Sequence, residues 1–322
     1  MPSITTHHIF GIEVYKNIKE KNIIKNDLLI YQTFTQSHDY LYYYTFDLKN
    51  AKKIKNLGST GHHEKTQEYI INIIKNIKKN NLSEYGPAIA YLYGVITHYV
   101  LDSTCHPYIF YKTGVYRKHD KSTHKYLGGH THIEKQLDAY YYKKYFNKDY
   151  KYCNINKEII KKPIFSDKLT NLITSSYKDT YNIDNIGNIF QKCIKDAKII
   201  MSLRSNDRLG IKKGIYRLVD IITKNKFHLK YYSTYINKIK IDFLNEDRKT
   251  WHHPSNKEIT YNYSFEDLFN LSIKKAVSII EDINQYLYDR KDLDELKESI
   301  PNVDYSTGFD LDKNIRMDYF EY

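Results

Sequence analysis

The stretch from Ala88 to Asp102 constrains the fold more than any other part of the sequence. It reads Ala-Ile-Ala-Tyr-Leu-Tyr-Gly-Val-Ile-Thr-His-Tyr-Val-Leu-Asp and is apolar almost all the way round a helix. Gly86-Pro87 precedes it, and proline is tolerated in the first turn of a helix. A helix with no polar face has to be surrounded by other elements, and this stretch falls short of the roughly 18 apolar residues that span a bilayer. The sequence therefore predicts a central buried helix.

The rest of the apolar pattern also has a helical period. Helices are expected over residues 11–34 with a polar break at 25–27, from about residue 65, and over 129–146, 167–181, 189–203, 210–224 and 265–288. No region alternates with the period of two that strands need, so a large sheet is not expected. Residues 40–61, 112–127, 149–165 and 251–264 are expected to be loops. The prediction is an all-α, multi-helix single domain.

Length and composition bound the organisation of the chain. Its 322 residues are 41% hydrophobic, which is enough to bury a core. We expect a helical domain over 1–230, an extension of the same domain over 231–300, and an acidic, aromatic tail over 301–322 that lies on the body or frays. Three cysteines are too few for a disulfide scaffold, and Met1 to His8 do not form a secretory signal, so a cytoplasmic protein is expected.

The net charge of +12 would ordinarily suggest an anionic partner. Lysine, asparagine, isoleucine and tyrosine are all abundant, however, and all four have AT-rich codons. Genome composition therefore explains part of the basicity and part of the 34 tyrosines. Neither feature alone predicts nucleic-acid binding.

Ionisable side chains on the apolar helix indicate a metal site. His98, Asp102 and His106 are spaced i, i+4 and i+8, so they drift only about 80° around the helix and share one stripe. His130 and Glu134 form a second pair one turn apart, and such pairs can offer two metal ligands on one face. A single histidine on an apolar face is usually an ordinary core residue. Two such helices within forty residues favour a centre that holds several metal ions.

Other histidines and nearby residues have weaker signals. His7, the His38-Asp39 pair and the His62-His63 doublet precede the two helices in the chain. Asp138 continues the stripe of His130 and Glu134 and is expected to orient a ligand. Cys105 lies off the ligand stripe and is expected to be packing, whereas the role of His252 and His253, after Trp251, stays open.

Taken together, the motifs resemble a known family. They are Thr6-His7 with Phe10-Gly11, Asp39-Tyr40-Leu41-Tyr42, Gly58-x-x-x-His62, Ala90-Tyr91-Leu92-Tyr93-Gly94, His98-x-x-x-Asp102-x-x-x-His106-Pro107-Tyr108 and His130-x-x-x-Glu134-x-x-x-Asp138. This combination, over about residues 1–145, resembles the bacterial zinc-dependent phospholipase C family. That family is related to single-strand-specific zinc nucleases and to the N-terminal domain of glycosylphosphatidylinositol-specific phospholipase D. Two later motifs resemble the C-terminal part of the intracellular branch of the phospholipase C family. They are Trp251-His-His-Pro254 and Ser264-Phe265-x-Asp-Leu268-Phe269.

The resemblance implies an all-α fold that holds up to three zinc ions between helices. It implies one zinc on His62, His98 and Asp102 and a second on His106, His130 and Glu134. The third would take His7, a bridging Asp102 and the N-terminal amine and carbonyl. Asp39 matches the acidic residue that acts as general base. The sequence departs from the secreted enzymes in beginning Met-Pro rather than with tryptophan, and in the shorter spacing from Asp102 to His106. His62 keeps the family register better than His63.

The expected activity is that of a zinc-dependent phosphodiesterase of phospholipase C type, in which metal-activated water attacks a phosphodiester. The expected partner is a phospholipid, with an anionic membrane surface as a further candidate and nucleic acid as a less favoured one. Three alternatives stay open: a nuclease, a catalytically silent metal-stabilised binding protein, and an HD-type phosphohydrolase. The last would use His7, His38-Asp39 and Asp102.

Overall fold

A computed structural model describes residues 4–224, 229–236, 242–313 and 315–321. Over these residues the chain is mainly helical, and its strands form one two-stranded antiparallel hairpin, so the all-α prediction is confirmed. The α-helices are α1 (Ile4–Asn17), α2 (Leu28–Phe34), α3 (Leu48–His63), α4 (Thr66–Lys79), α5 (Gly86–Thr113), α6 (Gly129–Phe146), α7 (Ile155–Glu158), α8 (Asp167–Tyr181), α9 (Ile186–Arg204), α10 (Ile211–Ile222), α11 (Phe265–Leu287) and α12 (Leu293–Ser299). The strands are β1 (Trp251–His253) and β2 (Asn256–Tyr261).

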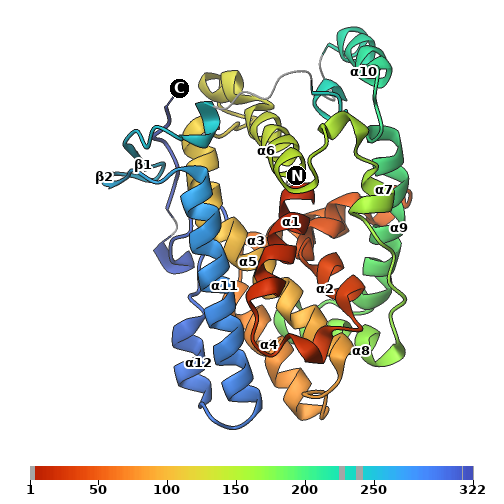
Figure 1. Cartoon of the computed structure of the whole chain (residues 1–322), viewed down its shortest axis with the longest axis vertical. Helices are drawn as coiled ribbons and strands as arrows, with labels where there is room; N and C mark the ends of the chain where they lie inside the picture. The colour runs from red at the N-terminus through yellow and green to blue at the C-terminus, as the bar shows by residue number, and fades with distance from the viewer. Residues whose placement is uncertain (1–3, 225–228, 237–241, 314, 322) are drawn as a thin grey trace.

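The predicted central helix is α5, which runs through the middle of the molecule (Figure 1). Pro87 lies in its first turn, and the helix ends before Gly114, whose φ of 66° suits glycine. Helices α1, α2, α4, α6 and α11 pack around it. At Gly94 the backbone of α2 comes so close that an added Cβ would lie 2.7 Å from Phe34 Cβ. The absence of a side chain at Gly94 therefore allows α2 to cross α5 closely.

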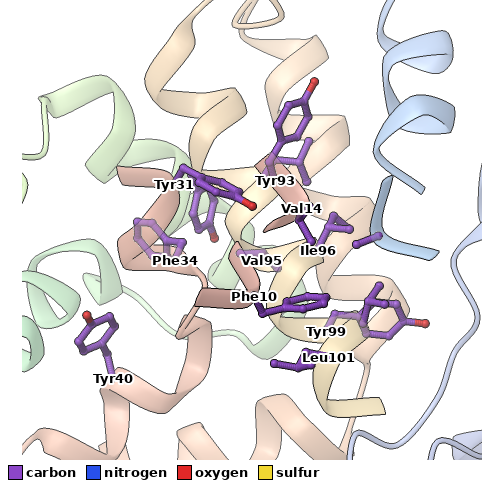
Figure 2. Close-up of a cluster of buried hydrophobic side chains, with 14 of the residues drawn as sticks. Phe10, Val14, Tyr31, Phe34, Tyr40, Tyr93, Val95, Ile96, Tyr99 and Leu101 are labelled. Atoms are coloured by element: carbon purple, nitrogen blue, oxygen red, sulfur yellow. The ribbon is translucent and has the colours of Figure 1, made fainter. Parts of the chain in front are cut away.

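Aromatic side chains fill the core on both sides of this crossing (Figure 2). The Phe34 ring meets the Tyr91 ring edge to face, with centroids 4.5 Å apart. Tyr31 is fully buried, and its hydroxyl donates to Gly11 O over 2.8 Å. Many of the abundant tyrosines therefore act as core residues, with their hydroxyl groups bonded inside the protein.

All four expected loops contain some regular structure. Residues 112–127 include the 3-10 helix Lys121–Tyr126 and residues 149–165 include the short helix α7, and the other two hold longer elements. Residues 40–61 include most of α3, so the prediction of a loop there is wrong. This helix is lysine-rich, and its buried side is made of few apolar residues, chiefly Ile54 and Leu57, together with Gly58 and Gly61. A Cβ at Gly61 would lie 2.5 Å from His38 Nδ1. Because α3 packs closely through small residues rather than through a wide apolar stripe, its apolar residues show only a weak helical period in the sequence.

Residues 251–264 hold the hairpin of β1 and β2, which also corrects the loop prediction. Trp251 pairs with Tyr261, and a bulge interrupts the register after His252. The Trp251 ring is buried against Tyr108 of α5, with centroids 5.1 Å apart. Strands this short contain too few residues for an alternation with a period of two to be recognised in the sequence.

The C-terminal part of the described chain returns to the central helix. Helix α11 begins with a capping box between Ser264 and Asp267 and packs along α5 and α1. After α12, the chain crosses α3 and α5, where Tyr305 is fully buried. Within the described residues, no helix combines the length and apolarity needed to cross a membrane.

Candidate metal centre

Asp102 lies at the centre of the stripe predicted on α5. Its carboxylate oxygens lie 3.0 Å from His7 Nε2, 3.4 Å from His98 Nε2, 3.8 Å from His62 Nε2 and 3.9 Å from His106 Nε2. All five side chains are buried. One carboxylate therefore faces four imidazole rings that come from three helices far apart in the sequence.

The side chains fall into two groups. The first, which we name the deep group, comprises His7, Asp39, His62, His98 and Asp102. Ligand atoms of His7, Asp39, His98 and Asp102 all lie within 4.8 Å of one another. His62 joins them through its Nε2, which is 3.2 Å from Asp39 Oδ1 and 3.2 Å from His98 Nε2. The deep group draws on α1, α3, α5 and the 3-10 helix η2 (Ser37–Tyr43).

The second group, which we name the outer group, comprises His106, His130 and Glu134. Ligand atoms of all three residues also lie within 4.8 Å of one another. Glu134 Oε1 is 3.0 Å from His130 Nε2 and 3.8 Å from His106 Nε2. His130 lies in the first turn of α6, and its side chain is 25% exposed, whereas Glu134 is buried. This is the side on which the centre meets solvent.

Backbone carbonyls orient three of the rings. The Nδ1 atoms of His62, His98 and His106 lie 2.6, 3.1 and 3.1 Å from Gly58 O, Thr35 O and Tyr305 O. A carbonyl can only accept, so each Nδ1 carries the proton and donates. In a neutral ring the Nε2 lone pair then points into the cluster. Metal-bound histidines are typically held in this way through their second nitrogen.

The arrangement fits cationic metal ions. His62 Nε2 and His98 Nε2 face each other at 3.2 Å, and two lone pairs at that distance are tolerated only with a proton or a metal cation between them. Asp39 Oδ2 is buried and has no hydrogen-bond partner within the described residues. Imidazole nitrogen and carboxylate oxygen together form the donor set that suits Zn²⁺.

The electrostatics agree with this chemistry. Burial works to lower the pKa of His106, but Asp102 and Glu134 outweigh it and raise that pKa to about 9. Burial works to raise the pKa of Asp102, yet the surrounding histidines lower it well below its usual range. His98 lies deepest, and desolvation lowers its pKa to about 3. The carboxylates are thus kept anionic in a buried place, where they attract positive charge.

Tyr305 is a residue of the centre that the sequence analysis missed. Its backbone N–H donates to His62 O over 3.0 Å, and its carbonyl accepts from His106 Nδ1. Its ring lies against His62 and His98, with centroids 5.2 and 5.8 Å away. The contribution comes from the backbone of a residue some 200 positions from its partners, and only the turn signal Asp-Tyr-Ser-Thr-Gly marks the segment in the sequence.

Asp138 fixes the position of α1, which carries His7. Its Oδ1 accepts from the backbone N–H groups of Thr5 and Thr6 over 3.1 and 2.9 Å, and its Oδ2 accepts from Tyr150 over 3.0 Å. Residues 1–3, with the N-terminal amine and carbonyl expected to bind a third zinc, lie outside the described residues. Asp138 thus links the start of α1 to α6, the helix of the outer group.

The remaining candidate histidines lie outside both groups. His63 pairs with Asp304 at 2.5 Å and is exposed, so His62 is the member of the doublet that faces the centre. His38 points to the Tyr177 hydroxyl at 2.5 Å, which removes the histidine that an HD-type site would need beside Asp39. His253 bonds to Thr307 O. Cys105 is buried 3.8 Å from Ser272 Oγ, in keeping with a packing role.

Comparison with known proteins agrees with the geometry. The family model described as "Zinc dependent phospholipase C" matches residues 6–186, more than half of the chain. That range includes every residue of both groups, whereas Tyr305 and helices α10 to α12 lie beyond it. No curated protein and no solved structure matches the chain significantly. On the family match, the chain belongs to the zinc-dependent phospholipase C family.

Proposed function

We propose that the chain is a zinc-dependent phosphodiesterase of the phospholipase C type and that its substrate is a phospholipid. One observation carries the proposal. His62, His98 and His106 each donate Nδ1 to a backbone carbonyl and turn Nε2 toward buried carboxylates, within the region that matches the family. This arrangement suits several hydrolytic metal ions held side by side.

The two groups suggest how the ions are shared. One zinc would take His62, His98 and Asp102, and a second would take His106, His130 and Glu134. A third would take His7 and the bridging carboxylate of Asp102, whose Oδ1 is 3.0 Å from His7 Nε2. When bound, zinc ions polarise phosphoryl oxygens and lower the pKa of water to about 7.

Asp39 is the residue we assign to proton transfer. It is buried in η2, and His62 Nε2 lies 3.2 Å from its Oδ1. Neither carboxylate oxygen has a hydrogen-bond partner among the described residues. A buried carboxylate with unused acceptor capacity beside the metal ligands can accept the proton of an attacking water molecule.

The substrate would approach from the outer group, because Tyr305 covers the deep group. A cavity of about 800 Å³ adjoins the first turn of α6, where His130 lies. Gly129 and Ile133 line it, and its charged lining is mixed: three lysines, Lys112, Lys125 and Lys249, and four carboxylates, Asp242, Glu246, Asp247 and Glu321.

The test compares two substrates on one zinc-loaded preparation: a short-chain phosphatidylcholine and single-stranded DNA. We expect release of diacylglycerol and phosphocholine, with little cleavage of DNA. Cleavage of DNA alone would show a nuclease. Bound zinc with no turnover on either phosphodiester would instead show a metal-stabilised binding protein.

Asp102→Asn tests the role of the metal centre. Because Asp102 faces four imidazole rings, its loss should lower the zinc content and reduce activity at least about 100-fold, while helical content is kept. Asp196→Asn is the matched control, since Asp196 is also a buried aspartate, but its carboxylate bonds to the Thr45 N–H outside the centre. Full activity of Asp102→Asn at normal zinc content would refute the assignment.

A further inference from the structure

Helix α10 presents its apolar side to solvent. Ile211, Ile215, Leu218 and Ile222 are spaced i, i+4, i+7 and i+11, so they form one stripe along the helix. Their side chains are between 53% and 79% exposed. A surface helix of a globular protein normally turns such a stripe toward the core. This helix does the opposite.

Hydrogen bonds made by the side of α10 opposite the apolar stripe hold the helix in this orientation. Asp220 is 1% exposed and accepts from the backbone N–H groups of Leu229 and Lys230, each over 2.8 Å. The Lys213 ammonium group donates to Tyr235 O over 2.9 Å, and the Tyr216 hydroxyl donates to Leu203 O over 2.6 Å. Turning the apolar stripe inward would break all of these bonds and take the Asp220 carboxylate away from the N–H groups of Leu229 and Lys230, which is costly.

Neighbouring segments extend the apolar surface. Leu203 near the end of α9 and Leu209 in the turn before α10 are both exposed. Figure 1 shows α10 at the edge of the molecule, beyond the end of α9 and away from the helices that surround α5. We name the surface formed by Leu209 and the exposed stripe of α10 the α10 face. Apolar patches of this kind on soluble proteins mark sites of interaction with a membrane or another protein.

Charge distinguishes between these two kinds of partner. Residues 198–224 contain seven basic and two acidic residues. Both acidic residues, Asp207 and Asp220, are buried, and Asp207 is engaged with the N–H groups at the start of α10. Arg208, Arg217 and Lys224 are exposed. An exposed apolar stripe whose exposed charged neighbours in the sequence are all cations is the pattern of helices that lie in the surface of an anionic bilayer.

We propose that the α10 face docks the protein on an anionic phospholipid bilayer, with the apolar stripe inserted among the acyl chains and Arg208, Arg217 and Lys224 beside the headgroups. This surface lies outside residues 6–186, so the inference goes beyond the hydrolytic centre and stands even if that centre proves inactive on lipids. Docking would explain why the polar side of α10 is the side bonded to the protein.

The experiment is co-sedimentation of the zinc-loaded full chain with vesicles of phosphatidylcholine, with and without phosphatidylserine. Lipid phosphorus in the pellet is measured to control for hydrolysis. We expect binding to vesicles that contain phosphatidylserine and a loss of at least about tenfold in the partition coefficient for Leu218→Glu combined with Ile222→Glu. Arg217→Glu should weaken binding only to the anionic vesicles, with an effect that shrinks as salt is added.

Ile164→Glu is the matched control, because Ile164 is 92% exposed but lies between α7 and α8, away from the α10 face. It should bind as the unmodified chain does. All variants should hydrolyse a monomeric short-chain substrate equally, which separates docking from the state of the metal centre. The proposal is overturned if the unmodified chain stays in the supernatant or the double variant still binds. It is also overturned if the α10 face instead mediates a dimer that the same variant dissociates.

Discussion

The two groups of the metal centre are built differently. The deep group gathers side chains from four elements, and all of its members are buried. The outer group depends on α5 and α6 alone, and His130 is partly open to solvent. Ring orientation does not separate the groups, because carbonyls hold rings in both, and His7 Nδ1 and His130 Nδ1 both have no hydrogen-bond partner among the described residues.

This contrast suggests a division of labour. A metal ion held in the deep group would also stabilise the fold, because it joins α1, α3 and α5 and neutralises buried carboxylates. An ion in the outer group would exchange more readily and face the substrate. Asp102 connects the two, since its Oδ1 lies 3.0 Å from His7 Nε2 and 3.9 Å from His106 Nε2.

The largest effect is expected from removing zinc altogether. Complete chelation should lower the midpoint of thermal unfolding by about 10 °C, because ligand binding at high saturation contributes about 4 kcal/mol and each kcal/mol shifts such a chain by a few degrees. Calorimetry before and after chelation measures the shift.

A graded chelator sharpens the comparison. Activity should fall with the first zinc ion lost, while the unfolding midpoint falls only with the later ones. Elemental analysis of the same samples gives the number of ions. If stability and activity fell together with the first ion, the two groups would not differ in the way we propose.

Replacing Tyr305 should have the next largest effect. Tyr305→Ala should lower the free energy of unfolding by about 3–5 kcal/mol, because it leaves a cavity beside His62 and His98. Tyr305→Phe should be neutral or slightly stabilising, since the buried hydroxyl has no hydrogen-bond partner among the described residues. Chemical denaturation of both variants tests this. Equal destabilisation by the two would show that the hydroxyl, rather than the ring, matters.

These residues show what the sequence can reveal. Helices α6 and α8 have the bounds predicted from the sequence, and the i, i+4 spacing alone places His98 with Asp102 and His130 with Glu134 on shared stripes of α5 and α6. Local periodicity carries this information because neighbouring turns of one helix fix the relative positions of their side chains. The spacing does not predict that these stripes meet His7, Asp39 and His62 in one centre. Only the family resemblance predicts that.

Other features depend on contacts between distant parts of the chain. Tyr305 acts through its backbone, which no residue type signals, and α3 packs through glycines rather than through an apolar stripe. The period of α10 predicts a helix, but it does not predict that Asp220 faces inward. Which side of an amphipathic helix is buried depends on the bonds that its polar side finds in the folded protein.

A smaller effect is expected from Asp138→Asn. The substitution removes the charge that accepts two backbone N–H groups at the start of α1, so the free energy of unfolding should fall by about 1–2 kcal/mol. Because α1 carries His7, zinc affinity at the deep group should also weaken. Zinc titration of the metal-free protein measures that change. An unchanged affinity would show that α1 is positioned by its other contacts with α5 and α11.

The smallest effect is expected from His63→Ala, which together with His62→Ala gives the sharpest control on the deep group. His62 faces Asp39 and His98, whereas His63 makes a surface ion pair with Asp304. His63→Ala should therefore cost no more than about 1 kcal/mol of stability and leave zinc content and activity unchanged. His62→Ala removes the same side chain one position earlier and should lose zinc and activity. The two variants have the same composition and alter the same helix end, so equal helical content in both would assign a difference in zinc content to the metal centre. Loss of zinc in His63→Ala with retention in His62→Ala would reverse the assignment and move the deep group to the other side of α3.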